Sequence, residues 1–164
     1  MPKTIKFKND TYLNTSGIMN NHTRLDNIFA GIMAYGGDDI NITNQIAWGI
    51  YKYNYFNLSQ NSNTNVFELS NGGVKIKQSG WYMMYSTINI DTNDGYGSGF
   101  ILVNDNPMVI KDIHQQGGMN NYDSPVEILY LNADTMIYAG FRLQETGTHL
   151  SRMSRSCLSI LRIS

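Results

Sequence analysis

The side chains that could carry out chemistry are few and widely separated. The three histidines, His22, His114 and His149, share no short spacing with one another or with Cys157, so the sequence contains no zinc motif. Cys157 lies in an apolar run typical of a strand, where a buried thiol behaves as a small hydrophobic side chain. We therefore expect no metal site and no cofactor.

The acidic and hydroxyl side chains also form no catalytic arrangement. Glu127 and Glu145 are isolated acids without a second carboxylate at a useful spacing. Asp91 and Asp94 could bind a calcium ion, but an Asp-rich turn without metal is the favoured interpretation. Residues 95–99 alternate glycine with Tyr96 and Ser98 and lack the strand-to-helix pattern of a nucleophile elbow. We expect no enzyme activity.

Composition narrows the class of protein. Hydrophobic residues make up 41% of the 164 positions and charged residues only 15%, with a net charge of −1. There is no basic stripe for nucleic acid, no apolar run long enough to span a membrane and no signal-peptide core at Met1. Polarity comes from Asn, Ser, Thr, Gln and Gly, which favour turns between strands, and this mixture predicts an all-β protein.

The first 28 residues differ from the rest. Residues 4–8 alternate polar and apolar side chains, which predicts a short strand, and residues 23–29 could form a helical turn. A segment so short and polar cannot bury a core of its own. We interpret residues 1–28 as an anchor or stalk whose contacts are made by Phe7, Tyr12, Leu13 and Ile18.

Residues 29–164 form the second unit, in which turn signals separate roughly ten short strands. We predict loops at 36–39, 59–65, 115–122 and 144–155, and strands at 31–35, 46–50, 51–58, 66–69, 74–77, 80–90, 100–103, 108–113, 126–131, 136–143 and 156–163. This pattern is typical of a β-sandwich or a jelly roll.

Several of these strands are apolar on both faces, although a sandwich strand needs only one apolar face. The clearest cases are residues 81–85, 128–131 and 136–139, together with the last strand. A second subunit would cover the second face, which otherwise would leave a large apolar patch exposed. The alternative is that Tyr and Met side chains are tolerated at the surface.

The spacing of several core positions resembles the globular heads of complement C1q, which share the tumour necrosis factor jelly roll. Four positions fit the family's residue types and four depart from them. The fitting residues are Phe56, Phe67, Gly80 and Tyr82, and the departing residues are Ser62, Val74, Met84 and Ser86. Residues 126–138 and 156–163 look like the family's last strands.

This resemblance implies a ten-strand jelly roll that forms a compact homotrimer around a threefold axis. It also implies that the strands beginning at Gly80 and Val126, and the last strand, lie near that axis. The predicted interface residues are Tyr82, Met84, Tyr130, Tyr138, Leu158 and Ile160.

Residues 5–13 and 16–21 look similar to leader segments of small bacteriophage structural proteins, and the content of Asn, Ile, Lys and Tyr suits an AT-rich genome. Our leading hypothesis is a non-enzymatic virion protein made in the host cytoplasm, a trimeric head fibre or spike. The expected partners are capsid or tail proteins, through residues 1–28, and a host cell-wall glycan, through residues 51–57 and 117–122. The alternatives are a receptor-binding tail-fibre tip, a cellular C1q-like ligand or, without positive support, an enzyme.

Overall fold

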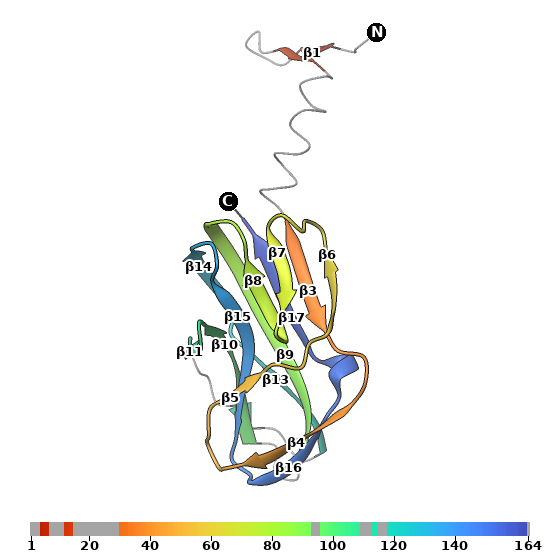
Figure 1. Cartoon of the computed structure of the whole chain (residues 1–164), viewed down its shortest axis with the longest axis vertical. Coiled ribbons are helices and arrows are strands. Elements are labelled where there is room, and N and C mark those ends of the chain that lie inside the picture. The colour runs from red at the N-terminus through yellow and green to blue at the C-terminus, as the bar shows by residue number, and fades with distance from the viewer. Residues whose placement is uncertain are drawn as a thin grey trace.

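Two antiparallel β-sheets packed face to face make up the main body of the protein (Figure 1). The computed structural model describes residues 4–6, 12–14, 30–92, 96–108, 113–114 and 118–163. Within these residues the only helical element is the 3-10 turn η1 (Met153–Arg155). The prediction of an all-β fold is confirmed.

The first sheet is built around the long strand β9 (Gly80–Thr92), and we call it the β9 sheet. The order of paired strands is β4-β16-β9-β17-β3-β6. β16 and β17 pair with one edge of β9, and β13 and β14 pair with its opposite edge. The bounds of its other strands are β3 (Gly31–Tyr35), β4 (Ile40–Gln45), β6 (Leu58–Asn61), β13 (Gly118–Asp123), β14 (Glu127–Leu131), β16 (Gly147–Ser151) and β17 (Cys157–Arg162).

The second sheet is built around β15 (Met136–Leu143), and we call it the β15 sheet. Its strand order is β11-β10-β15-β8-β7, with β5 also paired to β15 and β12 to β10. The bounds of its other strands are β5 (Tyr51–Tyr53), β7 (Phe67–Ser70), β8 (Gly73–Ile76), β10 (Tyr96–Val103), β11 (Asn106–Pro107) and β12 (Ile113–His114). The two sheets thus contain more and shorter strands than the ten that were predicted.

Two tight hairpins have the residues that their geometry requires. Asn71 and Gly72 connect β7 and β8 with positive φ angles of 50° and 71°, and Asn104 and Asp105 connect β10 and β11 with φ angles of 47° and 66°. Two successive residues with positive φ match the right-handed twist of the strands. A side chain at Gly72 would also collide with the backbone of Asn54, because its Cβ would lie 1.8 Å from that carbonyl oxygen.

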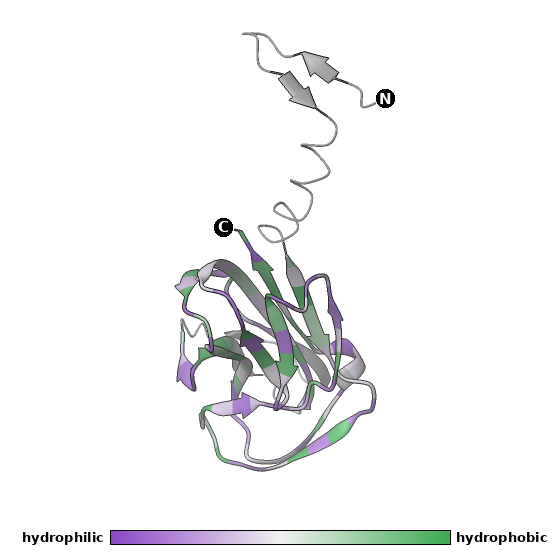
Figure 2. Ribbon diagram, turned by 45° about the horizontal axis from the view of Figure 1, so that its top comes forward, coloured by the Kyte–Doolittle hydropathy of each residue, from purple (hydrophilic) through white to green (hydrophobic). Residues whose placement is uncertain are grey.

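The core lies between the two sheets and follows the alternation of β9. Every second residue of β9 from Gly80 to Thr92 points inward and is buried. Aromatic rings from both sheets meet there: the Phe67 and Tyr82 rings are 5.9 Å apart and nearly perpendicular. Figure 2 shows the hydrophobic colour concentrated along these strands. The four positions that fit the C1q-like spacing are therefore buried in this core: Phe56, Phe67, Gly80 and Tyr82.

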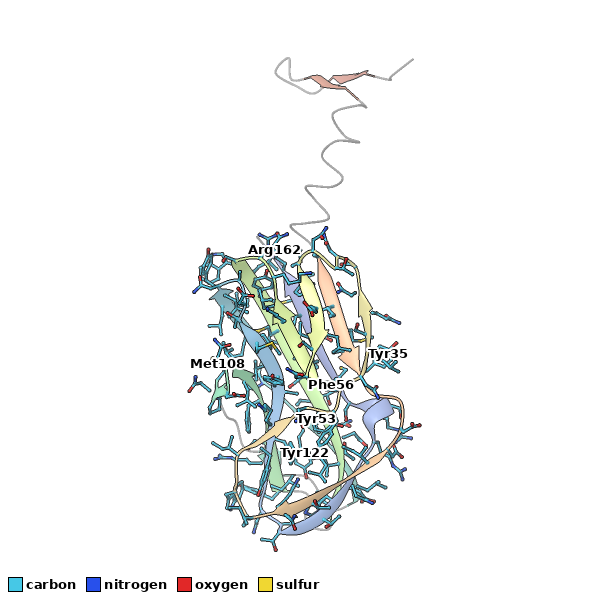
Figure 3. All side chains as sticks on the ribbon, in the orientation of Figure 1. Tyr35, Tyr53, Phe56, Met108, Tyr122 and Arg162 are labelled. Carbon is cyan, nitrogen blue, oxygen red and sulfur yellow. The ribbon has the colours of Figure 1, made fainter. Side chains whose placement is uncertain are left out.

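Polar groups share the lower half of this core, where Tyr53 and Tyr122 lie (Figure 3). The Tyr53 hydroxyl and Ser151 Oγ are 2.8 Å apart, and Tyr122 and Thr92 pair their hydroxyls at 3.1 Å. Each buried hydroxyl thus has a partner, which removes most of the cost of its burial.

A second apolar cluster covers the other face of β10 and β15. It consists of Phe100, Leu102 and Tyr138, with Met136 packed against it. The ammonium group of Lys52 lies 4.5 Å above the Tyr138 ring and is paired with Asp105 at 2.9 Å. Side chains of the same chain therefore cover the second apolar face of residues 136–139, which we had expected a neighbouring subunit to cover.

Some predicted strands and loops were wrong. Residues 46–50, predicted as a strand, form the loop between β4 and β5, and Trp48 within it turns the backbone with a φ of 58°. Residues 118–122, predicted as a loop, belong to β13 because the long β9 strand offers them a pairing edge. The strands β4, β6 and β16 were also missed, since their polar residues gave little alternating signal.

In the first 28 residues, β1 (Thr4–Lys6) and β2 (Tyr12–Asn14) pair in antiparallel orientation, with Ile5 opposite Leu13. The short strand predicted at 4–8 is confirmed for residues 4–6. Phe7, Ile18 and the predicted helical turn at 23–29 lie outside the described residues. The anchor role of Phe7, Tyr12, Leu13 and Ile18 stays a prediction, as does the boundary at residue 28.

Candidate self-association surface

The outward face of the β9 sheet carries large apolar side chains that none of the described residues covers. On β9, Trp81 and Met83 point away from the core, because they alternate with the buried Tyr82 and Met84. On β14, which pairs with β9, Ile128 and Tyr130 lie opposite Met83 and Trp81. The exposed fractions are 47% for Trp81, 52% for Ile128 and 55% for Tyr130, so half of each side chain contacts solvent.

The same face continues across β17 and β3. Leu161 lies opposite both Met83 and Gly31, and Ser159 lies opposite both Tyr85 and Met33. An open groove of about 660 Å³ runs along this part of the sheet. We call the following residues the outer face patch: Met33, Trp81, Met83, Val126, Ile128, Tyr130 and Leu161.

The part of this face around Thr87 carries polar side chains. Thr87 pairs with both Cys157 and Asp123 in register, and Tyr85 hydrogen-bonds Asp123. Partial burial, then the neighbouring Asp123, raises the pKa of Tyr85 to about 12. Burial likewise raises the pKa of the Cys157 thiol, so this thiol is a weak nucleophile at neutral pH. The face is therefore apolar near Trp81 and polar, with a neutral phenol, near Tyr85.

Five of the six side chains predicted for the subunit interface are buried within a single chain. Tyr82, Met84, Leu158 and Ile160 are at most 2% exposed within one chain, and Tyr138 is 7% exposed under the cluster on the β15 sheet. They are already core residues and cannot cover a neighbour. Tyr130 alone among the six is exposed. The subunit interface itself stays a prediction, and the exposed residues of β9 alternate with those predicted for it.

The aromatic loops predicted to contact a glycan are mostly internal. Tyr53 and Phe56 from residues 51–57 are buried, and so is Tyr122 from residues 117–122. Tyr55 is exposed, with its ring 5.2 Å from that of Tyr53. Most of these rings therefore stabilise the core instead of facing a ligand.

The candidate chemical groups stay apart in space. His149 is buried, and its Nδ1 lies 3.8 Å from Glu145 Oε2, while Nε2 has no hydrogen-bond partner among the described residues. Nowhere in the described part of the chain do three or more His, Cys, Asp or Glu side chains gather as a metal site would require. The side chains of His22, Asp94 and His114 lie outside the described residues. None of the described helical segments is long and apolar enough to cross a bilayer.

Comparison of the fold with solved structures identifies it as the jelly roll of tumour necrosis factor ligands. Eiger, a tumour necrosis factor from S. frugiperda, superposes with a TM-score of 0.57 at 12% identity, over 83% of this chain and 93% of the Eiger chain. Murine APRIL superposes with a TM-score of 0.58 at 9% identity, over 82% of this chain and 98% of its own. No protein-family model matches the sequence, and no curated protein matches it significantly.

These likenesses are structural, since the identities are too low to carry function. They confirm the predicted jelly roll of the tumour necrosis factor and C1q type.

Proposed function

We propose that this protein is a non-enzymatic structural and binding module that assembles as a homotrimer through the outer face patch. The exposed apolar side chains on β9 and β14 carry the proposal. Isolated surface apolar residues are ordinary, but a contiguous set with two large aromatic rings beside a groove marks an interaction site. Closed cyclic symmetry would cover this face in every copy.

The trimer comes from the resemblance to C1q-type jelly rolls, and the patch offers it one side of one sheet to bury. The β15 sheet has its second face covered by Phe100, Leu102 and Tyr138, so the two sides of the sandwich differ in chemistry. In the proposed assembly each β9 sheet turns toward the symmetry axis. The β15 sheet then faces outward and remains available for ligands.

We place this trimer on a bacteriophage particle, as a head fibre or spike. The support is the likeness of residues 5–13 and 16–21 to phage leader segments and the pairing of β1 with β2 ahead of the jelly roll. In this proposal residues 1–28 attach the trimer to capsid or tail proteins, and the jelly roll projects and contacts the host surface. A receptor-binding tip of a tail fibre would use the same module.

The second candidate is a cellular recognition ligand. The observation that favours it is the structural similarity to Eiger and APRIL, both tumour necrosis factor ligands. This candidate requires no particle attachment. The two functions therefore differ in what residues 1–28 do.

Particle attachment can be tested with antibodies raised against the purified chain. Immunogold electron microscopy of phage particles from the source of the sequence should label projections on the capsid or tail. Particles assembled with a chain that lacks residues 2–28 should lose that label. Unlabelled particles, or labelling that survives the truncation, would contradict the anchor proposal and favour a ligand that is not part of the particle.

A further inference from the structure

The loop between β4 and β5 forms a second exposed apolar surface, away from the outer face patch. Ile46 and Ile50 are exposed, and Trp48 between them is 38% exposed. In Figure 1, β4 and β16 lie at the bottom of the domain, and Arg162 is labelled at the top in Figure 3. The loop therefore lies at the end of the domain opposite Arg162.

The backbone of this loop is held in one conformation. Trp48 has a φ of 58°, a left-handed conformation that bulky residues seldom adopt, and its N–H donates to the Leu143 carbonyl at 2.6 Å. The N–H of Ile46 donates to the Tyr51 hydroxyl at 2.5 Å, and Gly49 N–H donates to the Ile46 carbonyl at 3.1 Å. Sparsely populated backbone conformations that are fixed in this way are concentrated at ligand sites.

The Trp48 ring is oriented by two neighbours from the β15 sheet. The ring of Tyr96 meets it edge to face, with centroids 5.2 Å apart and an interplanar angle of 86°. The Arg142 guanidinium carbon lies 5.3 Å from the centre of the Trp48 ring, and Arg142 Nε donates to Ser98 Oγ at 3.3 Å. An indole held in this way loses little conformational freedom on binding.

Apart from Arg142, the surface beside the ring is supplied by β4 and its loop, which are polar but uncharged. No charged residue occurs between positions 40 and 50. Strand β4 exposes Asn41, Thr43 and Asn44 next to the loop, and Thr148 is exposed on the paired strand β16. Amide side chains can both donate and accept hydrogen bonds, and hydroxyls can do the same.

We propose that this end of the domain, which we call the Trp48 platform, binds a neutral glycan with flat, β-linked pyranose rings. The apolar face of a pyranose ring would stack on Trp48 between Ile46 and Ile50. Sugar hydroxyls would accept hydrogen bonds from Arg142 and would exchange hydrogen bonds with the amides and hydroxyls of β4. This combination of one oriented aromatic ring, one arginine donor and neutral amides and hydroxyls matches a sugar, which is apolar on its ring faces and polar at its edges.

Two other occupants fit less well. A stable protein partner needs roughly 800 Å² from each side, and a loop of five residues offers much less. A membrane with anionic lipids attracts clusters of cations, and residues 40–50 have none. Trp48 and its ring contacts lie at the Leu143 end of β15, and none of them belongs to the outer face patch, so the site does not depend on the proposed trimer.

The two tryptophans of the chain make a sharp test, since Trp48 and Trp81 lie on the two different surfaces. Full-length protein labelled with ¹⁵N gives one indole N–H signal for each. Chitohexaose and cellohexaose serve as the neutral β-linked probes. We expect at least one of them to shift the Trp48 signal saturably while the Trp81 signal stays in place. Trp48→Ala should abolish binding by calorimetry, and Trp81→Ala should keep it.

A Trp48 signal that responds to neither oligosaccharide overturns the proposal, and the wild-type spectrum gives this answer even if Trp48→Ala fails to fold. A Trp48 signal that moves only with vesicles of phosphatidylcholine and phosphatidylglycerol also overturns it, because the loop would then be a lipid contact. The solution mass of the same sample reports on assembly separately. Failure of the trimer and failure of the glycan site are thus distinguishable.

Discussion

Trp81 on β9 and Tyr130 on β14 lie directly opposite each other in register, and their rings meet edge to face with centroids 5.9 Å apart. Aromatic pairs of this geometry usually lie inside a core or an interface. Here both side chains are about half exposed in the single chain. In the proposed trimer this pair would be the aromatic centre that another copy covers.

Neighbouring methionines of β9 should behave in opposite ways, because Met84 faces the core and Met83 faces outward. Met84→Ala should lower the free energy of unfolding by about 2 to 5 kcal/mol, as core truncations do. Met83→Ala should have a much smaller effect on unfolding at low protein concentration and should weaken association. Chemical denaturation and sedimentation of both variants check this pair. Equal destabilisation by the two changes would contradict the assignment of the faces.

Gly72 should not tolerate a side chain. Gly72→Ala must place a Cβ against the backbone of Asn54 while φ stays positive, so we expect a loss of about 2 kcal/mol or more in the free energy of unfolding. Gly37→Ala is the matched control, since its Cβ would meet only Leu58 Cδ1 at 3.7 Å. Thermal unfolding distinguishes them. A Gly72→Ala protein as stable as Gly37→Ala would show that the β7–β8 hairpin is described wrongly.

The buried hydroxyl of Tyr53 should contribute measurable stability. Tyr53→Phe leaves Ser151 Oγ without this partner, and we expect a cost of about 1 kcal/mol. Tyr55→Phe is the control, because Tyr55 is exposed and its ring contact is kept. Urea denaturation at neutral pH provides the measurement. A gain in stability for Tyr53→Phe would mean that the hydroxyl pair does not stabilise the fold.

The raised pKa of Tyr85 predicts that the free energy of unfolding falls at high pH. Partial burial and Asp123 raise its pKa to about 12, above the ordinary value of 10. The folded chain then holds this proton more tightly than the unfolded chain does. The stabilising contribution is complete below pH 10 and is lost as the pH rises through 12. Unfolding followed from pH 9 to 12 should show a weaker decline for Tyr85→Phe than for the wild type. Parallel declines would contradict this origin.

Much of the fold could be predicted from the sequence. Turn residues such as Asn71 and Asn104 mark hairpins by their chemistry, and the apolar run 81–85 with the alternation in residues 86–90 predicts a long sandwich strand. The missed strand β13 has a polar sequence, and it is held by pairing with β9, a long-range contact that no local pattern contains. Local patterns likewise favoured a strand at 46–50, where the backbone of Trp48 turns instead.

The sequence predicts that an exposed apolar surface exists, but it does not predict which residues form that surface. Residues 81–85 are large and apolar at every position, so the sequence shows that one set faces outward without showing which. The choice depends on the register of β9 with β14 and β17, which places Trp81 beside Tyr130 and buries Tyr82. The Trp48 platform was missed because its ring contacts, Tyr96 and Arg142, come from strands far along the chain.

The solution mass of the full chain, measured by light scattering after gel filtration, tests the central claim most directly. The wild type should have three times the chain mass of 18.6 kDa. Ile128→Glu places a charge in the outer face patch, where the side chain is exposed in one chain but covered in the assembly, and this variant should be a folded monomer. A wild type that is monomeric at high concentration, or an Ile128→Glu variant that remains trimeric, would contradict assembly through the outer face patch.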